Sequence, residues 1–232
     1  MQATQLLDVP MWANVAAIAV GSFQGAMYAA GFRNTRLDLL GVSVIGIATG
    51  LGGGILRDLL LNRLPIAFTE NYYILVAVGA ALVGMLLGQV AGKLDWLLSL
   101  MDAIALGLFA AIGTTAALAE QVPVVPALFI GVVTAVGGGV IRDVLLNMPI
   151  SVLHVGSLYA VAALLGAGTL VILLTSGMDV SAASAIGIVV TALVRLLAVR
   201  FGWSLPEQRV LKSLRNPKLV TPEDITGTIE LP

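Results

Sequence analysis

The feature that most constrains the fold is a segment that occurs twice at a constant spacing. Residues 52–62 read GGGILRDLLLN and residues 137–147 read GGGVIRDVLLN, so eight of eleven positions are identical at an offset of 85. The three differences exchange only Ile, Leu and Val. A repeat of this kind indicates a duplicated structural unit, and two such units must therefore build the architecture.

Composition places both copies in a membrane protein. The chain has 232 residues, of which 59% are hydrophobic and 11% charged, and its mean hydropathy is +1.02. Soluble domains carry about 25% charged residues. A net charge of −1 provides no basic patch for nucleic acid, and the chain has no cysteine for disulfides or thiolate chemistry.

The sequence also lacks the motifs of catalysis. There is no Ser/His/Asp set, no GxxxxGK[ST] and no HExxH, and a single histidine cannot make a metal cluster. We therefore expect no enzyme, no cofactor and no metal site beyond a permeating ion.

Seven apolar stretches predict an all-α, polytopic membrane protein with seven transmembrane helices. Each stretch has about 20 residues or more, enough to cross a hydrocarbon core of roughly 30 Å. We assign residues 1–200 to the transmembrane domain and residues 201–232 to a polar cytoplasmic tail. The expected helices lie near 12–32, 39–62, 71–92, 97–119, 124–147, 153–175 and 179–200.

The position of the two motifs predicts an inverted repeat. The motifs fall on the second and fifth helices, so one unit covers about 12–92 and the other about 97–175. Because three is an odd number, the second unit enters the membrane from the opposite side. The seventh helix, about 179–200, stands outside the duplication.

Lysine and arginine near the helix ends predict the orientation. Cytoplasmic loops carry an excess of these residues. One side holds only Arg63, with Asp8, Glu70, Glu120 and Asp179, so we expect the N-terminus outside and the C-terminus in the cytoplasm. The other side holds Arg33, Arg36, Lys93, Arg200, Arg209, Lys212, Arg215 and Lys218.

Three successive glycines predict a break in each motif helix. Glycine weakens a helix by about 1 kcal/mol relative to alanine. A break would free carbonyl oxygens suited to a cation, and neighbouring threonine hydroxyls could add to them. The alternative is that the glycines allow close helix packing. The candidate pore and hinge residues are Gly52, Gly53, Gly54, Gly137, Gly138, Gly139, Thr49 and Thr134.

The motif charges predict the electrostatics of such a pore. Ionisable groups at membrane depth are costly and suggest function. Arg57 and Asp58 are adjacent, so they point about 100° apart on a helix. One hypothesis exchanges partners between the copies, with Arg57 toward Asp143 and Arg142 toward Asp58. The other has each charge bonding a nearby helix end.

Single polar residues add further predictions. Asp102 is either a helix N-cap, which we favour, or a polar group at the pore mouth, and Asp38 is predicted to cap the second helix. The remaining predictions are C-terminal caps at Asn62 and Asn147, and an Arg195 side chain that snorkels to the interface. For Tyr159 we favour lipid or core packing over a hydroxyl that reaches the pathway, and for His154 an interface position over a proton relay.

The chain resembles the prokaryotic branch of the trimeric intracellular cation (TRIC) channel family. TGLGGGILRDLLLNRLP at 49–65 and TAVGGGVIRDVLLNMP at 134–149 carry the resemblance, supported by DLLG at 38–41 and MDAIALGLFAAIG at 101–113. Asp102 has no polar counterpart near Ala16 in the first helix. GGGxxRD replaces the lysine-containing motif of animal relatives, so animal-type regulation by calcium or phosphoinositide is not implied.

The resemblance implies a homotrimer among membrane lipids, in the cell membrane of a bacterium or archaeon, with a pore inside each protomer. Kinked second and fifth helices would line a path for K⁺ and, as a further candidate, Na⁺. Our first hypothesis is thus a K⁺-permeable channel. The alternative is a secondary transporter of a small zwitterion such as glycine, and the weakest is a sealed membrane scaffold.

Overall fold

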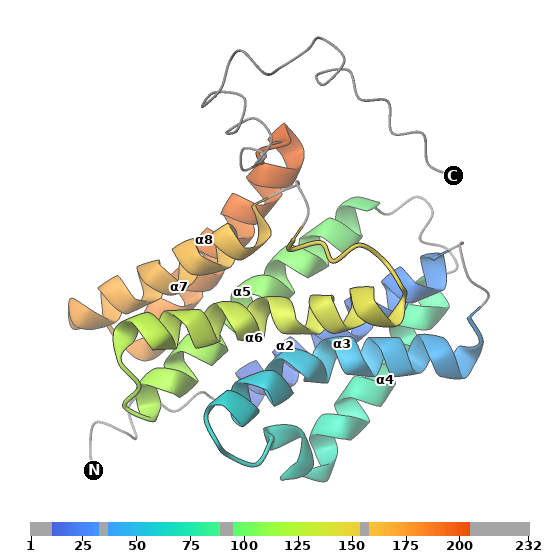
Figure 1. Cartoon of the computed structure of the whole chain (residues 1–232), viewed down its shortest axis with the longest axis horizontal. Helices are drawn as coiled ribbons and strands as arrows, with labels where there is room; N and C mark the ends of the chain where they lie inside the picture. Colours follow the sequence, from blue (N-terminus) through green and yellow to red (C-terminus); the bar gives the residue numbers. More distant parts are fainter. Residues whose placement is uncertain (1–10, 33–36, 89–94, 154–157, 205–232) are drawn as a thin grey trace, which may run out of the picture.

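The computed structural model describes residues 11–32, 37–88, 95–153 and 158–204, and within these residues the fold is all-α, as predicted (Figure 1). One short 3₁₀ helix, η1, covers Ile66–Phe68. His154 and nearly all of the predicted tail lie outside the described residues. The seven long helices are α2 (Met11–Gly31), α3 (Leu39–Leu60), α4 (Asn71–Gly88), α5 (Asp95–Ala119), α6 (Val124–Leu145), α7 (Tyr159–Thr175) and α8 (Val180–Phe201).

Most of these helices are long and apolar enough to cross a membrane. Five satisfy both conditions, namely α3, α4, α5 from Trp96 onward, α6 and α8, while α7 is apolar but shorter. Helix α2 has 21 residues but carries Asn14, Ser22 and Gln24, which are all buried inside the protein. The polar groups of α2 therefore face the helix bundle.

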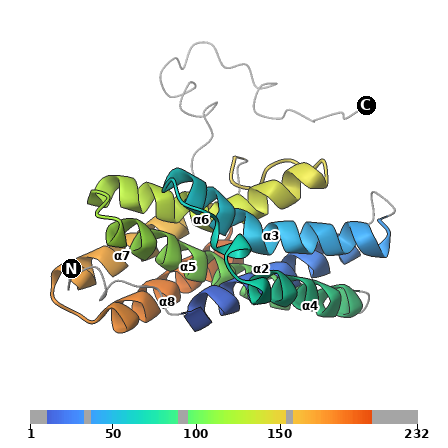
Figure 2. The same cartoon turned by 90° about the horizontal axis from the view of Figure 1, so that it is seen from below.

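The helices alternate in direction, and α3 and α6 cross as antiparallel neighbours (Figures 1 and 2). We call the side where α3, α5 and α7 end the Arg57 face. The side where α2, α4, α6 and α8 end is the Arg142 face. A contact of Arg63 with Glu120, which follow α3 and α5, agrees with this arrangement.

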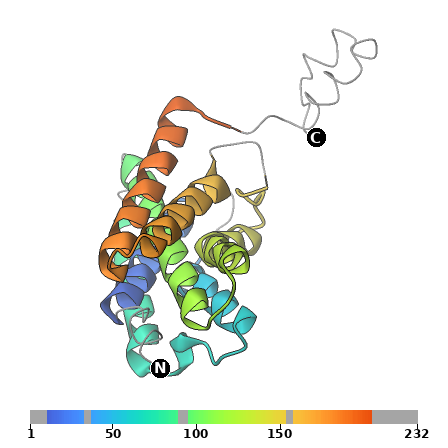
Figure 3. The same ribbon diagram turned by 90° about the vertical axis from the view of Figure 1, so that its left-hand side faces the viewer.

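Matching contacts establish the inverted repeat. In the first unit α2 packs on α3 and α4, and in the second α5 packs on α6 and α7. Helix α8 lies outside both units and packs on α5 and α7 (Figure 3). A Cβ added to Gly25 would lie 2.5 Å from Thr49 Oγ1, and one added to Gly113 would lie 2.5 Å from Thr134 Oγ1.

These contacts also correct the alignment of the first helices of the two units. Gly25 and Gly113 are 88 residues apart, whereas their threonine partners are 85 apart. The counterpart of Asp102 is therefore Asn14, and the expectation of an apolar match near Ala16 is wrong. The difference arises because the connection between the first two helices is longer in the first unit than in the second.

The predicted helix breaks are also wrong. Helix α3 runs without interruption through Gly52–Gly54, and α6 does so through Gly137–Gly139. A continuous helix satisfies its backbone groups internally, which matters where lipid offers no hydrogen bonds. The glycines instead let two helix backbones approach each other, which was the alternative interpretation.

Both motif helices end in the same way. Asn62 and Asn147 follow the helices in the left-handed conformation, with φ of 53° and 52°. In each copy an equivalent backbone bond closes the turn, from Arg63 N to Asp58 O (2.9 Å) in the first and from Met148 N to Asp143 O (2.8 Å) in the second. The predicted C-terminal caps are therefore confirmed, as is Asp38, whose Oδ1 accepts from Gly41 N at 2.6 Å.

Candidate functional site

The crossing of α3 and α6 brings the two glycine triplets together. A Cβ on Gly53 would overlap the carbonyl oxygen of Thr134, and a Cβ on Gly138 would overlap that of Thr49. Because backbone atoms occupy both positions, neither glycine can gain a side chain without separating the helices. The repeat therefore creates two equivalent backbone contacts between the helices, Gly53 against Thr134 and Gly138 against Thr49.

The outer glycines of each triplet have different surroundings. The first glycines, Gly52 and Gly137, each face an aliphatic side chain of the other helix. The third glycines do not: nothing lies within 4 Å of a Cβ on Gly54, and only Tyr159 Oη (3.4 Å) and an Arg142 nitrogen (3.9 Å) lie near one on Gly139. On one side of the crossing α3 thus presents little-covered backbone at Gly54, and on the other side α6 does so at Gly139.

The threonine hydroxyls bond within their own helices. Thr49 Oγ1 donates to Ile45 O at 2.7 Å, and Thr134 Oγ1 donates to Ile130 O at 2.6 Å. Their side chains fill the contacts to α2 and α5, and their carbonyl oxygens meet the central glycines. Both threonines are buried at the crossing, where their backbone oxygens contact the opposite helix.

Arg57 pairs with its own neighbour, so the predicted exchange between copies is wrong. Arg57 Nε lies 2.8 Å from Asp58 Oδ1, and Nη2 lies 3.0 Å from Oδ2. The arginine side chain is long enough to fold back along the helix end, so the two groups meet although adjacent helix positions point about 100° apart. Asp58 also accepts from Arg63 Nε at 2.8 Å and from the backbone N–H of Ile66 at 2.9 Å.

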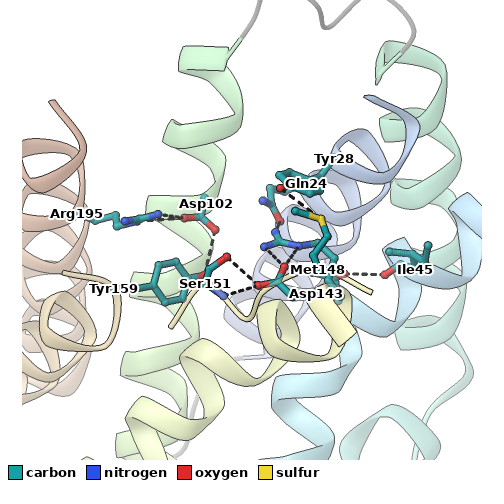
Figure 4. Close-up of polar contacts among 11 residues, drawn as sticks. Gln24, Tyr28, Ile45, Asp102, Asp143, Met148, Ser151, Tyr159 and Arg195 are labelled. Atoms are coloured by element: carbon teal, nitrogen blue, oxygen red, sulfur yellow. Dashed lines mark hydrogen bonds and ion pairs between the residues drawn. The ribbon is translucent and has the colours of Figure 1, made fainter. Parts of the chain in front are cut away.

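The second motif repeats the pair on the Arg142 face with a different supporting group (Figure 4). Arg142 Nε and Nη2 lie 3.0 and 2.8 Å from Asp143 Oδ1. Asp143 Oδ2 accepts from the backbone N–H and the hydroxyl of Ser151, at 2.9 and 2.8 Å. In both copies the aspartate holds the loop eight residues later, which agrees with the hypothesis that each charge bonds a nearby helix end.

Arg142 is also held from α2. Its Nη1 lies 3.4 Å from Gln24 Oε1, and its Cζ lies 4.4 Å from the centre of the Tyr28 ring. Such a cation over a ring face is favourable, more so when water is excluded. The guanidinium is therefore fixed by side chains from both repeat units.

Asp102 belongs to a second polar cluster on the same face, and its predicted role as a cap is wrong. It lies inside α5, where Oδ1 accepts from Tyr159 Oη at 3.1 Å. Oδ2 accepts from Arg195 Nε and Nη2, both at 3.2 Å. Arg195 Cζ lies 4.6 Å from the centre of the Tyr159 ring. The cluster joins α5, α7 and α8 (Figure 4).

Two other predictions fail at this cluster. Arg195 does not snorkel, because its guanidinium bonds the Asp102 carboxylate inside the bundle. Tyr159 is not merely a packing residue, because its hydroxyl donates to Asp102 and also lies beside Gly139. The cluster therefore adjoins the open side of the second glycine triplet.

A cavity of about 420 Å³ lies on the Arg57 face, and we call it the Arg57 vestibule. A second cavity of about 10 Å³, lined in part by Asn14, Gly54, Arg57 and Phe109, lies between it and the crossing. Arg57 and Asn14 line both cavities. The vestibule is lined by Met11, Asn14, Arg57, Arg63, Leu64, Ile66, Thr69, Tyr72, Tyr73, Ala116 and Ala119.

Several residues of the site escaped prediction, and they share one property. Asn14, Gln24, Tyr28, Arg63 and Ser151 all lie outside the repeated motif. Only Asn14 had a usable signal, because an alignment of the first and fourth helices at 88 residues pairs it with Asp102. The described residues contain no group of three His, Cys, Asp or Glu side chains that could hold a metal ion.

Comparison with known proteins places this geometry in a family. A family model described as "Glycine transporter" matches residues 11–89 and 99–175, which are the two repeat units. The inner membrane protein YadS of Escherichia coli (strain K12), a UPF0126 protein, is 33% identical over 198 residues, covering 84% of this chain and 94% of YadS.

Solved structures share the fold over nearly their whole length. A structure described in terms of conductance through TRIC cation channels aligns with a TM-score of 0.75 at 32% identity, covering 87% of this chain and 98% of the other. The TRIC orthologue from Rhodobacter sphaeroides aligns with a TM-score of 0.75 at 30% identity, covering 88% and 100%. The chain therefore belongs to the UPF0126 family of membrane proteins, and its fold is that of the prokaryotic TRIC channels.

Proposed function

We propose that the protein is a channel for monovalent cations, permeable to K⁺, with the conduction path inside each protomer. The observation that carries the proposal is the crossing of α3 and α6. On one side of it the backbone of Gly54 adjoins Arg57, and on the other side the backbone of Gly139 adjoins Tyr159. The solved proteins that share this fold are described as cation channels. A path along α3 and α6 would need no side chain to move aside at Gly54.

The proposed path has three parts. It begins in the Arg57 vestibule, passes Gly54 to the crossing, and leaves past Gly139 and the Asp102 cluster. The cavity beside Gly54 has a volume of about 10 Å³, which is about the space that one water molecule needs. The crossing is thus the constriction, and conduction requires a small displacement of α3 against α6.

The charges along this path suit a regulated cation channel. Arg57 and Arg142 each form an ion pair with the adjacent aspartate, which lowers the barrier that a bare arginine would present to a cation. Asp102 contributes a carboxylate near the end of the path, and Arg195 partly neutralises it. A cation that approaches the Arg142 face competes with Arg195 for this carboxylate.

The relatives support a proposal for assembly and membrane location. The R. sphaeroides protein is described as a trimeric intracellular cation channel orthologue, and YadS as an inner membrane protein. We propose a homotrimer in the cell membrane of a bacterium or archaeon, surrounded by lipids, with the Arg57 face outside. Helices α4 and α8 expose many large apolar side chains, as lipid or subunit contacts require.

Single-channel recording tests the function. Purified protein would be reconstituted in a planar bilayer with asymmetric KCl and then with NaCl on one side. We expect discrete current steps that reverse near the K⁺ equilibrium potential, with a smaller Na⁺ permeability. Folded and inserted protein that stays silent, or that conducts Cl⁻ in preference to K⁺, would contradict the proposal.

Asp102→Asn links the current to the proposed path. The variant removes a negative charge at the Arg142 face together with the ion pair to Arg195, so the unitary K⁺ current should fall. Glu70→Gln is the matched control, because Glu70 is an exposed carboxylate in the loop before α4 on the opposite face. Equal currents in the Asp102 variant and the control would remove this residue from the path.

A secondary transporter of a small zwitterion such as glycine predicts a different result. Saturable uptake into liposomes that depends on an ion gradient, without current steps, would favour it over the channel.

A further inference from the structure

The Arg57 vestibule is built from groups that donate hydrogen bonds or carry positive charge. Its polar lining consists of two arginines, one asparagine, one threonine and two tyrosines, and none of the described residues that line it is Asp or Glu. Its volume of about 420 Å³ lies within the range of roughly 300–1,000 Å³ that is usual for small-molecule sites.

The wall of this vestibule carries an excess positive charge. Asp58 is buried, and its single negative charge serves two guanidinium groups, those of Arg57 and Arg63. Glu120 compensates weakly, because its carboxylate lies 3.5 Å from Arg63 Nη1 and is 53% exposed to solvent. Two cations and one buried anion leave a charge of about +1 beside the cavity.

The second motif shows that this excess is not a consequence of the repeat. There the place of Arg63 is taken by Ser151, which supports Asp143 with its backbone N–H and its hydroxyl. The Arg142–Asp143 pair is therefore balanced in charge. Among the described residues, only the Arg57 face has a second arginine on the motif aspartate.

Asn14 supplies a neutral donor beside the charge. Its side chain lines both the vestibule and the small cavity next to Gly54. It is almost fully buried, and no hydrogen bond joins it to another described side chain. A carboxamide that is buried and faces a cavity is best satisfied by water or by a ligand, because an unmade bond is costly.

We propose that the Arg57 vestibule is a binding site for a small monovalent oxyanion, such as a carboxylate. The guanidinium groups of Arg57 and Arg63 would supply charge-assisted hydrogen bonds, and the Asn14 carboxamide a neutral one. Met11, Leu64, Ile66 and two alanines form the apolar part of the wall. Two oxygens on one small group match a planar guanidinium, which favours a carboxylate over a single-atom anion.

Binding has a consequence for conduction, and this part rests on the proposed channel function. An anion in the vestibule cancels the excess charge at the point where a cation must pass Arg57. The unitary K⁺ current should therefore increase when the anion is supplied on the Arg57 face and stay unchanged when it is supplied on the other face.

Titration calorimetry with acetate tests the site directly. Purified protein in a neutral detergent would be titrated at constant ionic strength, with chloride, a single-atom anion, as the counterion. We expect one saturable event per protomer. Arg63→Gln should weaken it by about tenfold or more, as expected for the loss of a charge-assisted bond. Asn14→Ala should weaken it by a smaller factor without a change in charge.

Arg200→Gln is the matched control. Arg200 lies near the end of α8 on the Arg142 face, over the ring of Phe201, so the variant loses the same charge away from the vestibule. Size-exclusion chromatography and circular dichroism would show that each variant is folded. The absence of saturable binding of both acetate and an anionic lipid to the wild type, or equal weakening by Arg63→Gln and Arg200→Gln, would overturn the proposal.

The phosphate of an anionic lipid has the same chemistry, and a second titration separates the two sources. Phosphatidylglycerol would be added to the micelles in place of acetate. Acetate binding that this lipid does not displace identifies a soluble ligand. Lipid binding that Arg63→Gln abolishes, without acetate binding, supports the same site with a headgroup as its occupant.

The outcomes also distinguish this proposal from the channel proposal. Cation currents without anion binding would remove the anion site and leave the channel. Anion binding in a protein that conducts no current would leave the site and remove the channel.

Discussion

Alanine substitution at the glycine triplet tests the central contact of the fold. In Gly53→Ala the new methyl group would overlap the carbonyl oxygen of Thr134, a backbone atom within a helix that cannot turn away. Overpacking of this kind costs about 1–3 kcal/mol. In Gly54→Ala the methyl group meets nothing within 4 Å, and the helix gains about 0.5–1 kcal/mol from the replacement of glycine.

The free energy of unfolding should therefore fall in Gly53→Ala and rise in Gly54→Ala, although the two positions are neighbours in one helix. We expect the free energies of unfolding of Gly53→Ala and Gly54→Ala to differ by about 2–4 kcal/mol. Gly138→Ala should match Gly53→Ala, because its methyl group would overlap the carbonyl oxygen of Thr49. The double variant of Gly53 and Gly138 should cost less than the sum of the two, because the first methyl group already separates the same helices.

The assay is reversible unfolding in mixed micelles, with sodium dodecyl sulfate as the denaturant and circular dichroism as the signal. Helical content before unfolding shows whether each variant folds. A Gly53→Ala variant as stable as the wild type would refute the close backbone contact. Equal destabilisation by Gly53→Ala and Gly54→Ala would show that the glycines act through local helix geometry, as the predicted breaks required.

Two further predictions concern charge and orientation. Asp58→Asn leaves Arg57 buried without its partner and should cost about 3–5 kcal/mol in the same unfolding assay, whereas Glu120→Gln, at an exposed pair, should change stability by less than about 1 kcal/mol; similar losses would refute the role of burial. The chain has no cysteine, so Glu70→Cys should react with a membrane-impermeant maleimide in intact cells and Trp203→Cys only after permeabilisation, and the reverse pattern would invert the proposed topology.

The helices and their ends could be predicted because local signals specify them. Apolar length identified most of the spans, an aspartate before the second helix identified its N-cap, and the asparagines after each motif identified the C-terminal caps. Each of these depends on residues within a few positions of one another. The boundaries accordingly agree with the expected ranges to within two residues, apart from the start of the sixth helix, at Tyr159 rather than 153, and the expected end of the third at 92, which lies outside the described residues.

The glycine triplets show where such local reasoning fails. Their low helix propensity is a real cost of about 1 kcal/mol per residue, and it predicts a break if the helix is considered alone. The helix survives because a second helix packs against the same glycines and because an unbroken helix leaves no backbone group unsatisfied. Neither reason can be read from the motif itself.

The charged residues failed in prediction for a related reason. Ideal helix geometry separates Arg57 and Asp58 by about 100°, yet the arginine is long enough to return to its neighbour at a helix end. Asp102, Tyr159 and Arg195 are 36 or more residues apart in the sequence. Nothing in the chain pairs them until α5, α7 and α8 pack together.

The sequence by itself determined that the protein crosses a membrane, that its architecture is duplicated, and that three glycines, an arginine and an aspartate recur in each unit. Composition and repetition are properties of the chain, so no partner is needed to read them. Only the tertiary structure decided which atoms these residues meet: a carbonyl oxygen across the crossing, an adjacent carboxylate, or the open space of a vestibule. Those contacts depend on the closeness and direction of helices far apart in the sequence, and packing alone sets both.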